Sequence, residues 1–158
     1  MRKRTRPGWR TIATGAVVVL LLVGYLMLRG TDAGTAPQPA PTTTQTASTD
    51  EQLGRLFATQ QSDVEVTGVG WVTRLLADDT EGGRHQRFIL QLASGQTLLV
   101  AHNIDVAPRL DGLAVGDRVA FRGEYVYTDQ GGTIHWTHHD PGGTHTAGWL
   151  DWNGRRYG

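Results

Sequence analysis

Four of the six histidines in this chain lie within one short run, HWTHHDPGGTH, which extends from His135 to His145. Imidazoles are the side chains that most often bind metal ions or transfer protons near neutral pH. If residues 140–143 form the loop of a hairpin, His138 lies opposite His145. Directly opposed residues have Cβ atoms about 4.5–5.5 Å apart, a spacing that suits two imidazoles on one ion. The pattern is therefore compatible with a divalent metal site.

A complete metal site needs further ligands, and the sequence offers two. Asp140 lies in the expected loop itself, and His102 ends another expected strand. Three protein ligands and one open position are typical of a catalytic metal centre. The candidate ligands for Zn²⁺ or another divalent ion are His102, His138, His145 and Asp140. Their spacing matches none of the common zinc motifs, so the alternative that these histidines bond to turn carbonyls stays open.

A third possibility is that polar side chains at this end of the domain contact a ligand without a metal. Loops that follow strand ends often carry binding residues. Arg87 lies on the strand face opposite to Phe88, where it could hold a phosphate or carboxylate. The residues expected to bind a polar ligand in this way are Arg87, His102, Asn103, His135 and His139. The simpler alternative for this basic stretch is that Arg84 pairs with Asp78 or Asp79 across a turn.

Aromatic residues gather late in the chain and permit two interpretations. If exposed, they could stack on bases or sugars; if buried, they belong to the core. The expected hairpin places Ile134 opposite Trp149, with Trp136 on the same face, so we expect these residues in the core. Trp152 and Tyr157 are then the candidates for surface contacts.

Short strands must position all of these residues, because the chain from Val64 onward alternates between apolar and polar side chains. The first strand changes phase across residues 68–70, which indicates a bulge or a sharp bend. Further strands are expected at 85–92, 96–102, 118–127 and 133–139, and a short amphipathic helix at 48–60 precedes them. Five or six evenly spaced strands, with one longer connection after the third, predict a mainly β domain that forms a small OB-like barrel.

The chain begins with a basic stretch that is followed by an uncharged one. Residues 1–11 carry five basic side chains and no acidic one. Residues 12–28 carry no charge, and as a helix with a rise of about 1.5 Å per residue they reach roughly 26 Å, enough to cross a hydrocarbon core. The positive-inside rule leaves the N-terminus in the cytoplasm. We expect a single-pass signal anchor in the inner membrane with the domain facing the periplasm or the exterior; the alternative is a cleaved signal peptide and a secreted domain.

The rest of the chain divides into a linker and a folded domain. Residues 29–49 are rich in Pro and Thr and hold no large apolar side chain, so a disordered linker is expected. Residues 50–158, the expected β domain, carry nine Arg against fourteen Asp and Glu, a formal net charge of −5. Nucleic acid is disfavoured as a partner because its binding requires a basic surface. The chain has no Cys, which excludes disulfides and thiolate metal sites.

Three long strings in the domain carry a family resemblance. They are RHQRFILQLASGQTLLVAHNID, VGDRVAFRGEYVY and GGTIHWTHHDPGGTHTAGW. Together they resemble a family of small exported bacterial proteins known only as a domain of unknown function, over about residues 52–157. The resemblance implies an exported domain of this size without an assigned activity, and no catalytic residue can be carried over from it.

Two classes of function follow from these features. The first is a non-catalytic binding module of the cell envelope, which recognises a polar ligand or an envelope protein and contacts the membrane through its N-terminal helix. The second is a phosphoesterase-like, metal-dependent hydrolase that uses the metal ligands above, with Arg87 on the substrate anion. Because the sequence contains no P-loop, GxGxxG, GxSxG or HExxH motif, the binding module is the leading expectation and no cofactor is assured.

Overall fold

The computed structural model describes residues 43–158 and the side chains from residue 46 onward. The basic tail predicted at 1–11, the membrane span predicted at 12–28 and the linker predicted at 29–49 as far as residue 42 lie outside the described residues. Within residues 43–158, none of the helical segments has the length and hydropathy of a transmembrane span.

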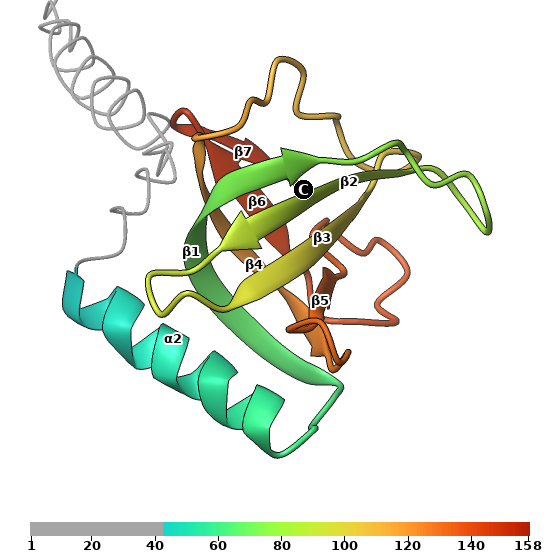
Figure 1. Ribbon diagram of the computed structural model, residues 1–158. Coiled ribbons are helices and arrows are strands. Elements are labelled where there is room, and N and C mark those ends of the chain that lie inside the picture. The colour runs from blue at the N-terminus through green and yellow to red at the C-terminus, as the bar shows by residue number, and fades with distance from the viewer. Residues whose placement is uncertain (1–42) are drawn as a thin grey trace, which may run out of the picture. The chain divides into compact units, whose positions relative to one another are not determined.

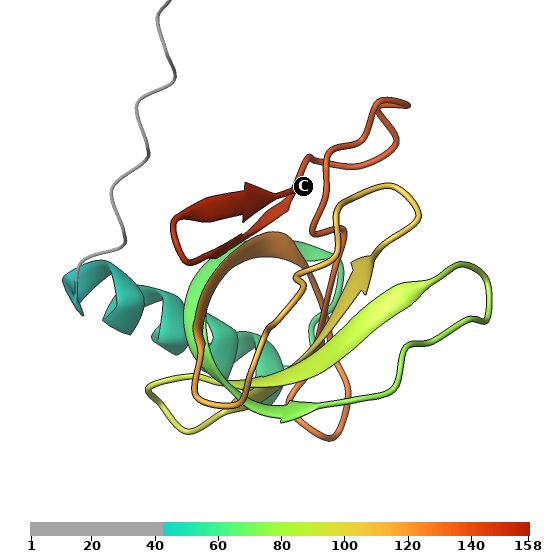
Figure 2. The ribbon, with the colours of Figure 1, turned by 90° about the horizontal axis from the view of Figure 1, so that it is seen from above.

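The described chain is mainly β, as predicted, with one helix at its N-terminal side (Figure 1). The elements are α2 (Thr43–Ala58), β1 (Val64–Leu75), β2 (His85–Gln91), β3 (Thr97–Asn103), β4 (Arg118–Val126), β5 (Thr133–His135), β6 (Trp149–Trp152) and β7 (Arg155–Tyr157). The strands follow the order β1-β2-β3-β5-β4-β6-β7, and β1 also pairs with β4. Five strands thereby close into a mixed barrel, which Figure 2 shows from above, and β6 and β7 are additional strands.

The long first strand closes the barrel because its first part pairs with one strand and its second part pairs with another. Residues 64–71 of β1 pair with β4, and residues 71–75 pair with β2. The strand lies close to its neighbours at two glycines: a Cβ at Gly68 would lie 2.5 Å from the ring of Phe121, and one at Gly70 would lie 3.0 Å from the Gln91 carbonyl oxygen. Figure 1 shows β1 curved along its length, but its register with β4 is unbroken over residues 64–71, so no bulge lies at the predicted residues 68–70. The register shift lies further on, between Val72 and Arg74.

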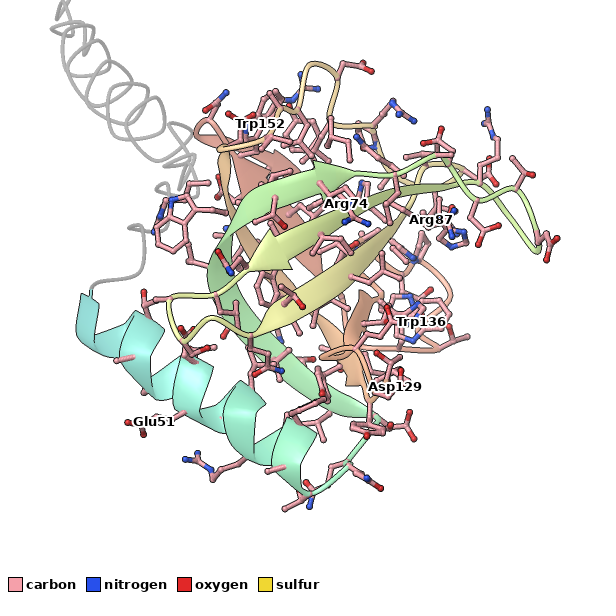
Figure 3. All side chains as sticks on the ribbon, in the orientation of Figure 1. Glu51, Arg74, Arg87, Asp129, Trp136 and Trp152 are labelled. Carbon is pink, nitrogen blue, oxygen red and sulfur yellow. The ribbon has the colours of Figure 1, made fainter. Side chains whose placement is uncertain are left out.

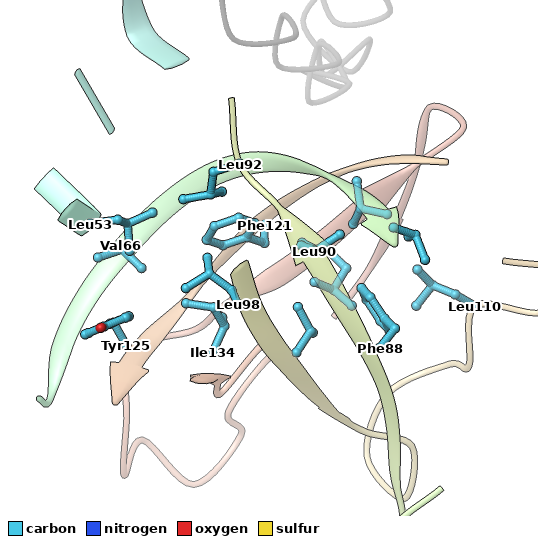
Figure 4. Packing of buried hydrophobic residues seen from close by; sticks show 14 of the residues in the cluster. Leu53, Val66, Phe88, Leu90, Leu92, Leu98, Leu110, Phe121, Tyr125 and Ile134 are labelled. Carbon is cyan, nitrogen blue, oxygen red and sulfur yellow. The ribbon is translucent and has the colours of Figure 1, made fainter. Parts of the chain in front are cut away.

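The core fills the barrel with alternate residues of each strand (Figure 4). Its fully buried side chains include Phe88, Leu98, Phe121, Tyr125 and Ile134, from four different strands. Burial of each such side chain contributes roughly 1.5–3 kcal/mol. Because side chains alternate along a strand, the same pattern turns the residues between these positions outward, toward the outer face of the barrel.

The helix α2 covers one side of this core. Leu53 and Leu56 are buried, and Leu53 lies next to Val66 in Figure 4. Asp50 fixes the helix to the β2–β3 turn, since its Oδ2 accepts a hydrogen bond of 2.9 Å from the Ser94 amide. The helix begins at Thr43 rather than at residue 48, so residues 43–49 of the predicted linker are helical. Once the buried turns are docked, extension of a helix costs little where no Gly or Pro interrupts it.

The predicted hairpin at residues 133–149 is the main error of the sequence-based topology. The strand expected at 133–139 ends at His135, and Ile134 pairs with Val100 of β3 and Tyr125 of β4 instead of Trp149. Trp149 pairs with Arg122, further along the same edge of β4. β5 and β6 therefore share one edge of β4 in succession, and they do not pair with each other.

Candidate functional site

Trp136 is the most unusual residue at the surface of the barrel. It follows β5 directly, adopts a positive φ of 51°, and leaves 42% of its surface exposed. Its indole Nε1 donates a hydrogen bond of 3.2 Å to Oε1 of Glu124, and its ring stacks on that of His145 with 4.3 Å between centroids. Positive φ in a bulky side chain is a genuine outlier, and such strain gathers at binding sites. Figure 3 shows Trp136 on the outside of the domain, beside β5.

Two hollows lie next to each other at Trp136 and share Trp136 and Glu124 as walls. The first has a volume of about 470 Å³, and the second one of about 280 Å³. The first is lined, among others, by Glu65, Arg122, Glu124, Trp136, Thr144 and His145. The second is lined by polar side chains that include His85, Asn103, Glu124, His135 and His138. We call this surface the Trp136 groove.

Strand pairing explains how the second hollow is assembled from distant parts of the sequence. His85, at the start of β2, pairs directly with Asn103, at the end of β3. Glu124 of β4 pairs directly with His135 of β5. Because β5 lies between β3 and β4, these two pairs come to the same outer face. Burial lowers the pKa of His135, as does the nearby His85, while Glu124 opposes them.

The loop 136–148 forms one side of the groove, and Asp140 organises it. Its carboxylate accepts hydrogen bonds from the amides of Gly142, Thr144 and His145, and from the Thr144 hydroxyl at 2.8 Å. These bonds hold the pKa of Asp140 well below its usual range. The oxygens of Asp140 are thus already used within the loop, where they fix the position of His145. This is a structural role, and it differs from the metal ligand that was predicted.

His138 and His145 lie side by side, as predicted, although no hairpin brings them together. Their ring centroids are 5.0 Å apart in an edge-to-face arrangement. In each ring Nδ1 donates to a backbone carbonyl, at 2.8 Å to His139 and at 2.9 Å to Thr146. A carbonyl oxygen can only accept, so Nε2 of His138 is the ring atom left for a further partner, while Nε2 of His145 lies 3.9 Å from Oδ2 of Asp140.

His102 has a structural role that both predicted sets of site residues missed. Its side chain is fully buried, with Nδ1 2.8 Å from the Thr137 hydroxyl and Nε2 3.1 Å from the Pro108 carbonyl oxygen. Both ring nitrogens are therefore engaged, and burial lowers its pKa to about 4. Among residues 43–158 no three His, Asp or Glu side chains are grouped as a metal site. The predicted set of His102, His138, His145 and Asp140 is not assembled as a set of ligands.

The remaining predicted ligand residues are divided between the groove and the rest of the surface. Asn103 and His135 line the second hollow, whereas Arg87 and His139 line neither hollow. Arg87 extends toward the β1–β2 loop (Figure 3), where it bonds to the Ala77 carbonyl oxygen and pairs with the carboxylate of Asp79. The sequence predicted an ion pair between Arg84 and Asp78 or Asp79 in this turn; the structure pairs Arg87 with Asp79 instead.

Arginines elsewhere on this face are also paired with carboxylates. Arg84 pairs with Asp105 at 2.7 Å, and Arg122 pairs with Glu65. A second arginine pairs with the turn that holds Asp78 and Asp79, since Arg109 lies 2.6 Å from the carboxylate of Asp78. These partners neutralise the positive charge that an anionic ligand would need.

Sequence reasoning missed three residues of the groove: His85 as a neighbour of His135, Glu124, and Trp136 as an exposed side chain. Nothing in the sequence indicated that Trp136 is exposed, because a continued strand would point its side chain into the core together with that of Ile134. A signal for His102 was present and overlooked. It shares the alternation of Leu98 and Val100, which points it inward.

Comparison with known proteins identifies one family. A family model described as "Protein of unknown function (DUF3465)" matches residues 39–158, in agreement with the resemblance found in the sequence. No curated protein matches the chain.

Proposed function

The chain belongs to the DUF3465 family, and because that family has no assigned function, we propose from the site itself that the domain is a non-catalytic binding module. Its ligand is an extended polar molecule that lies along the Trp136 groove and contacts both hollows. The domain is exported and is held at the cell envelope.

The exposed and strained Trp136 is the observation that carries this proposal. A positive φ in a residue with a bulky side chain costs about 1–3 kcal/mol. Because the indole is partly exposed, it also contributes less hydrophobic stabilisation than a buried one would. Glu124 and His145 nevertheless hold the ring in one orientation, between two hollows. A fixed aromatic surface with polar groups on both sides is suited to bind a ligand.

The topology of the barrel supports the same location. The strand order β1-β2-β3-β5-β4, the closing β1–β4 pair and the parallel β3–β5 pair favour an OB-like barrel. Barrels of this type bind oligonucleotides or oligosaccharides across the face of strands 2 and 3. His85 and Asn103 belong to β2 and β3, and both line the second hollow.

A binding module agrees better with the described side chains than a metal-dependent hydrolase does. The hydrolase needs three metal ligands, but both nitrogens of His102 and the oxygens of Asp140 already bond within the protein. Arg87, which was to hold the substrate anion, lines neither hollow and pairs with Asp79.

We also propose a location for the domain from the N-terminal sequence. The basic residues 1–11 remain in the cytoplasm, and the uncharged residues 12–28 cross the inner membrane. The domain then faces the periplasm, where its ligand is a component of the envelope. If the anchor is cleaved, the same domain is secreted.

The experiment compares two tryptophans of equal exposure. Trp136→Ala removes the wall shared by the two hollows, whereas Trp71→Ala removes a side chain that is 41% exposed on β1 and lines neither hollow. The full chain and both variants, in detergent micelles, are applied to immobilised oligosaccharides, peptides and oligonucleotides. We expect Trp136→Ala alone to lose binding. Equal binding by all three proteins, or no binding by any, would contradict the proposal.

A further inference from the structure

We infer that the ligand of the Trp136 groove is an uncharged oligosaccharide whose successive sugar rings occupy the two hollows, with the indole of Trp136 between them. This inference rests on the proposed function and names the class of ligand. It follows from the hydrogen-bonding groups of the second hollow, from the charges around both hollows, and from their arrangement.

The polar groups of the second hollow suit hydroxyl groups. His85 and His138 each use Nδ1 toward a backbone carbonyl, at 3.2 Å and 2.8 Å, which leaves Nε2 of each ring for a ligand. Asn103 accepts from the Asp105 amide through Oδ1, so its NH₂ group is the part that can donate. A sugar hydroxyl both donates and accepts, and it can therefore bond to an imidazole nitrogen or to an amide.

The charges around the groove disfavour an anionic ligand. Glu124 contributes a carboxylate to both hollows, and neither Arg nor Lys is among the described residues that line the second one. Arg122 in the first hollow is held by Glu65, with its Nε at 2.9 Å. Burial and His85 lower the pKa of His135, which disfavours the charged form of that imidazole. A phosphate or carboxylate would meet a carboxylate here without a free cation to bind it.

A cationic ligand would find one carboxylate, that of Glu124, without a cationic partner among the described residues. The Glu65 carboxylate is already paired with Arg122, and Oε1 of Glu124 accepts from the indole of Trp136. The imidazole of His145 covers part of the Trp136 ring by stacking on it. What remains is a flat apolar ring beside uncharged polar groups and the Glu124 carboxylate, which matches a sugar, because a sugar has apolar C–H groups and hydroxyls that can donate to a carboxylate.

The arrangement of the hollows predicts a dependence on chain length. The two hollows meet only at Trp136 and Glu124, so a single sugar ring fills one of them and a longer chain reaches both. Affinity should therefore rise from the monosaccharide to the oligosaccharide, until both hollows are occupied.

The test measures binding of defined oligomers to the full chain in detergent micelles by calorimetry. The uncharged probes are β-1,4-linked oligomers of glucose and of N-acetylglucosamine, from one to several units. Chitosan oligomers serve as the cationic probe, oligogalacturonate as the anionic one, and oligothymidylate as the nucleic acid. We expect an uncharged oligomer to bind best, with affinity that increases with length and falls roughly ten- to hundredfold in Trp136→Ala.

Two control variants separate loss of binding from loss of folding. Trp71→Ala should bind like the unchanged chain, and Trp136→Phe, which keeps an aromatic ring, should retain part of the affinity. Tighter binding of a charged probe, with the same sensitivity to Trp136→Ala, would overturn the uncharged ligand but uphold the binding module. If no probe depends on Trp136, both the ligand class and the proposed function are wrong.

Discussion

His102 makes the stability of this domain depend on pH in a way that can be measured. The imidazole lies inside the barrel, where Nε2 donates to the Pro108 carbonyl oxygen and Nδ1 accepts from the Thr137 hydroxyl. These two bonds connect β3 to the loops before β4 and after β5. A proton added to Nδ1 would turn the Thr137 hydroxyl from donor to acceptor and place a charge in the core.

The size of the effect follows from the two pKa values. Burial lowers the pKa of His102 from 6.5 to about 4, so below pH 6.5 the unfolded chain takes up a proton that the folded chain resists. The free energy of unfolding is therefore highest above pH 6.5 and decreases as the pH falls toward 4. Each pH unit in this interval costs about 1.4 kcal/mol, and the whole interval amounts to about 3 kcal/mol. Between about pH 7.5 and about pH 4.5, the expected loss is about 2–3 kcal/mol.

The assay is urea unfolding at these two pH values, followed by far-UV circular dichroism. His102→Gln cannot titrate and should lose most of the pH dependence, whereas His139→Gln, an exposed control, should keep it. His135 contributes a smaller change in the same direction, because its pKa is also lowered. The carboxylates with lowered pKa change the free energy of unfolding only below their ordinary pKa of 3.8, which lies outside this range. They are Asp79, Asp105 and Asp140. Full pH dependence in His102→Gln would refute the reasoning.

Four further substitutions test how the fold is held together and how it supports the groove. Gly123→Ala should lower stability by about 1–3 kcal/mol in thermal unfolding, since the new Cβ would collide with the backbone of β5, whereas Gly54→Ala on α2 meets open space and should raise it by about 1 kcal/mol. Asp50→Ala should cost about 1–3 kcal/mol and increase amide exchange in α2, because the Ser94 amide loses its acceptor. Asp140→Asn should speed amide exchange in the loop that carries His145 and weaken ligand binding; unchanged exchange there would contradict the role given to Asp140.

The candidate site was only partly accessible to sequence reasoning, and particular residues show why. His138 and His145 were expected to be neighbours, and their rings do lie together, since a short loop rich in Gly and Pro brings back its own ends. His85 and His135 are fifty residues apart in the sequence, and they meet in the second hollow only because β5 inserts between β3 and β4. Sequence spacing holds no information on such a contact.

Trp136 is a second residue whose surroundings could not be predicted from sequence spacing. Alternation places it in the core together with Ile134, but the strand ends at His135 and the left-handed backbone of Trp136 turns its indole outward. The available edge of β4 decides where β5 stops, because β6 pairs with the other part of that edge. That competition is a property of the assembled sheet.

The amino-acid sequence by itself determined the mainly β class, the positions of most strands and the acidic charge of the domain. These features depend on the period of apolar residues and on local turn residues, which act over a few positions along the chain. Only the tertiary structure decided which polar side chains are engaged and which are available. His102 became a buried structural group and Trp136 an exposed one, because closure of the barrel selects what each side chain touches.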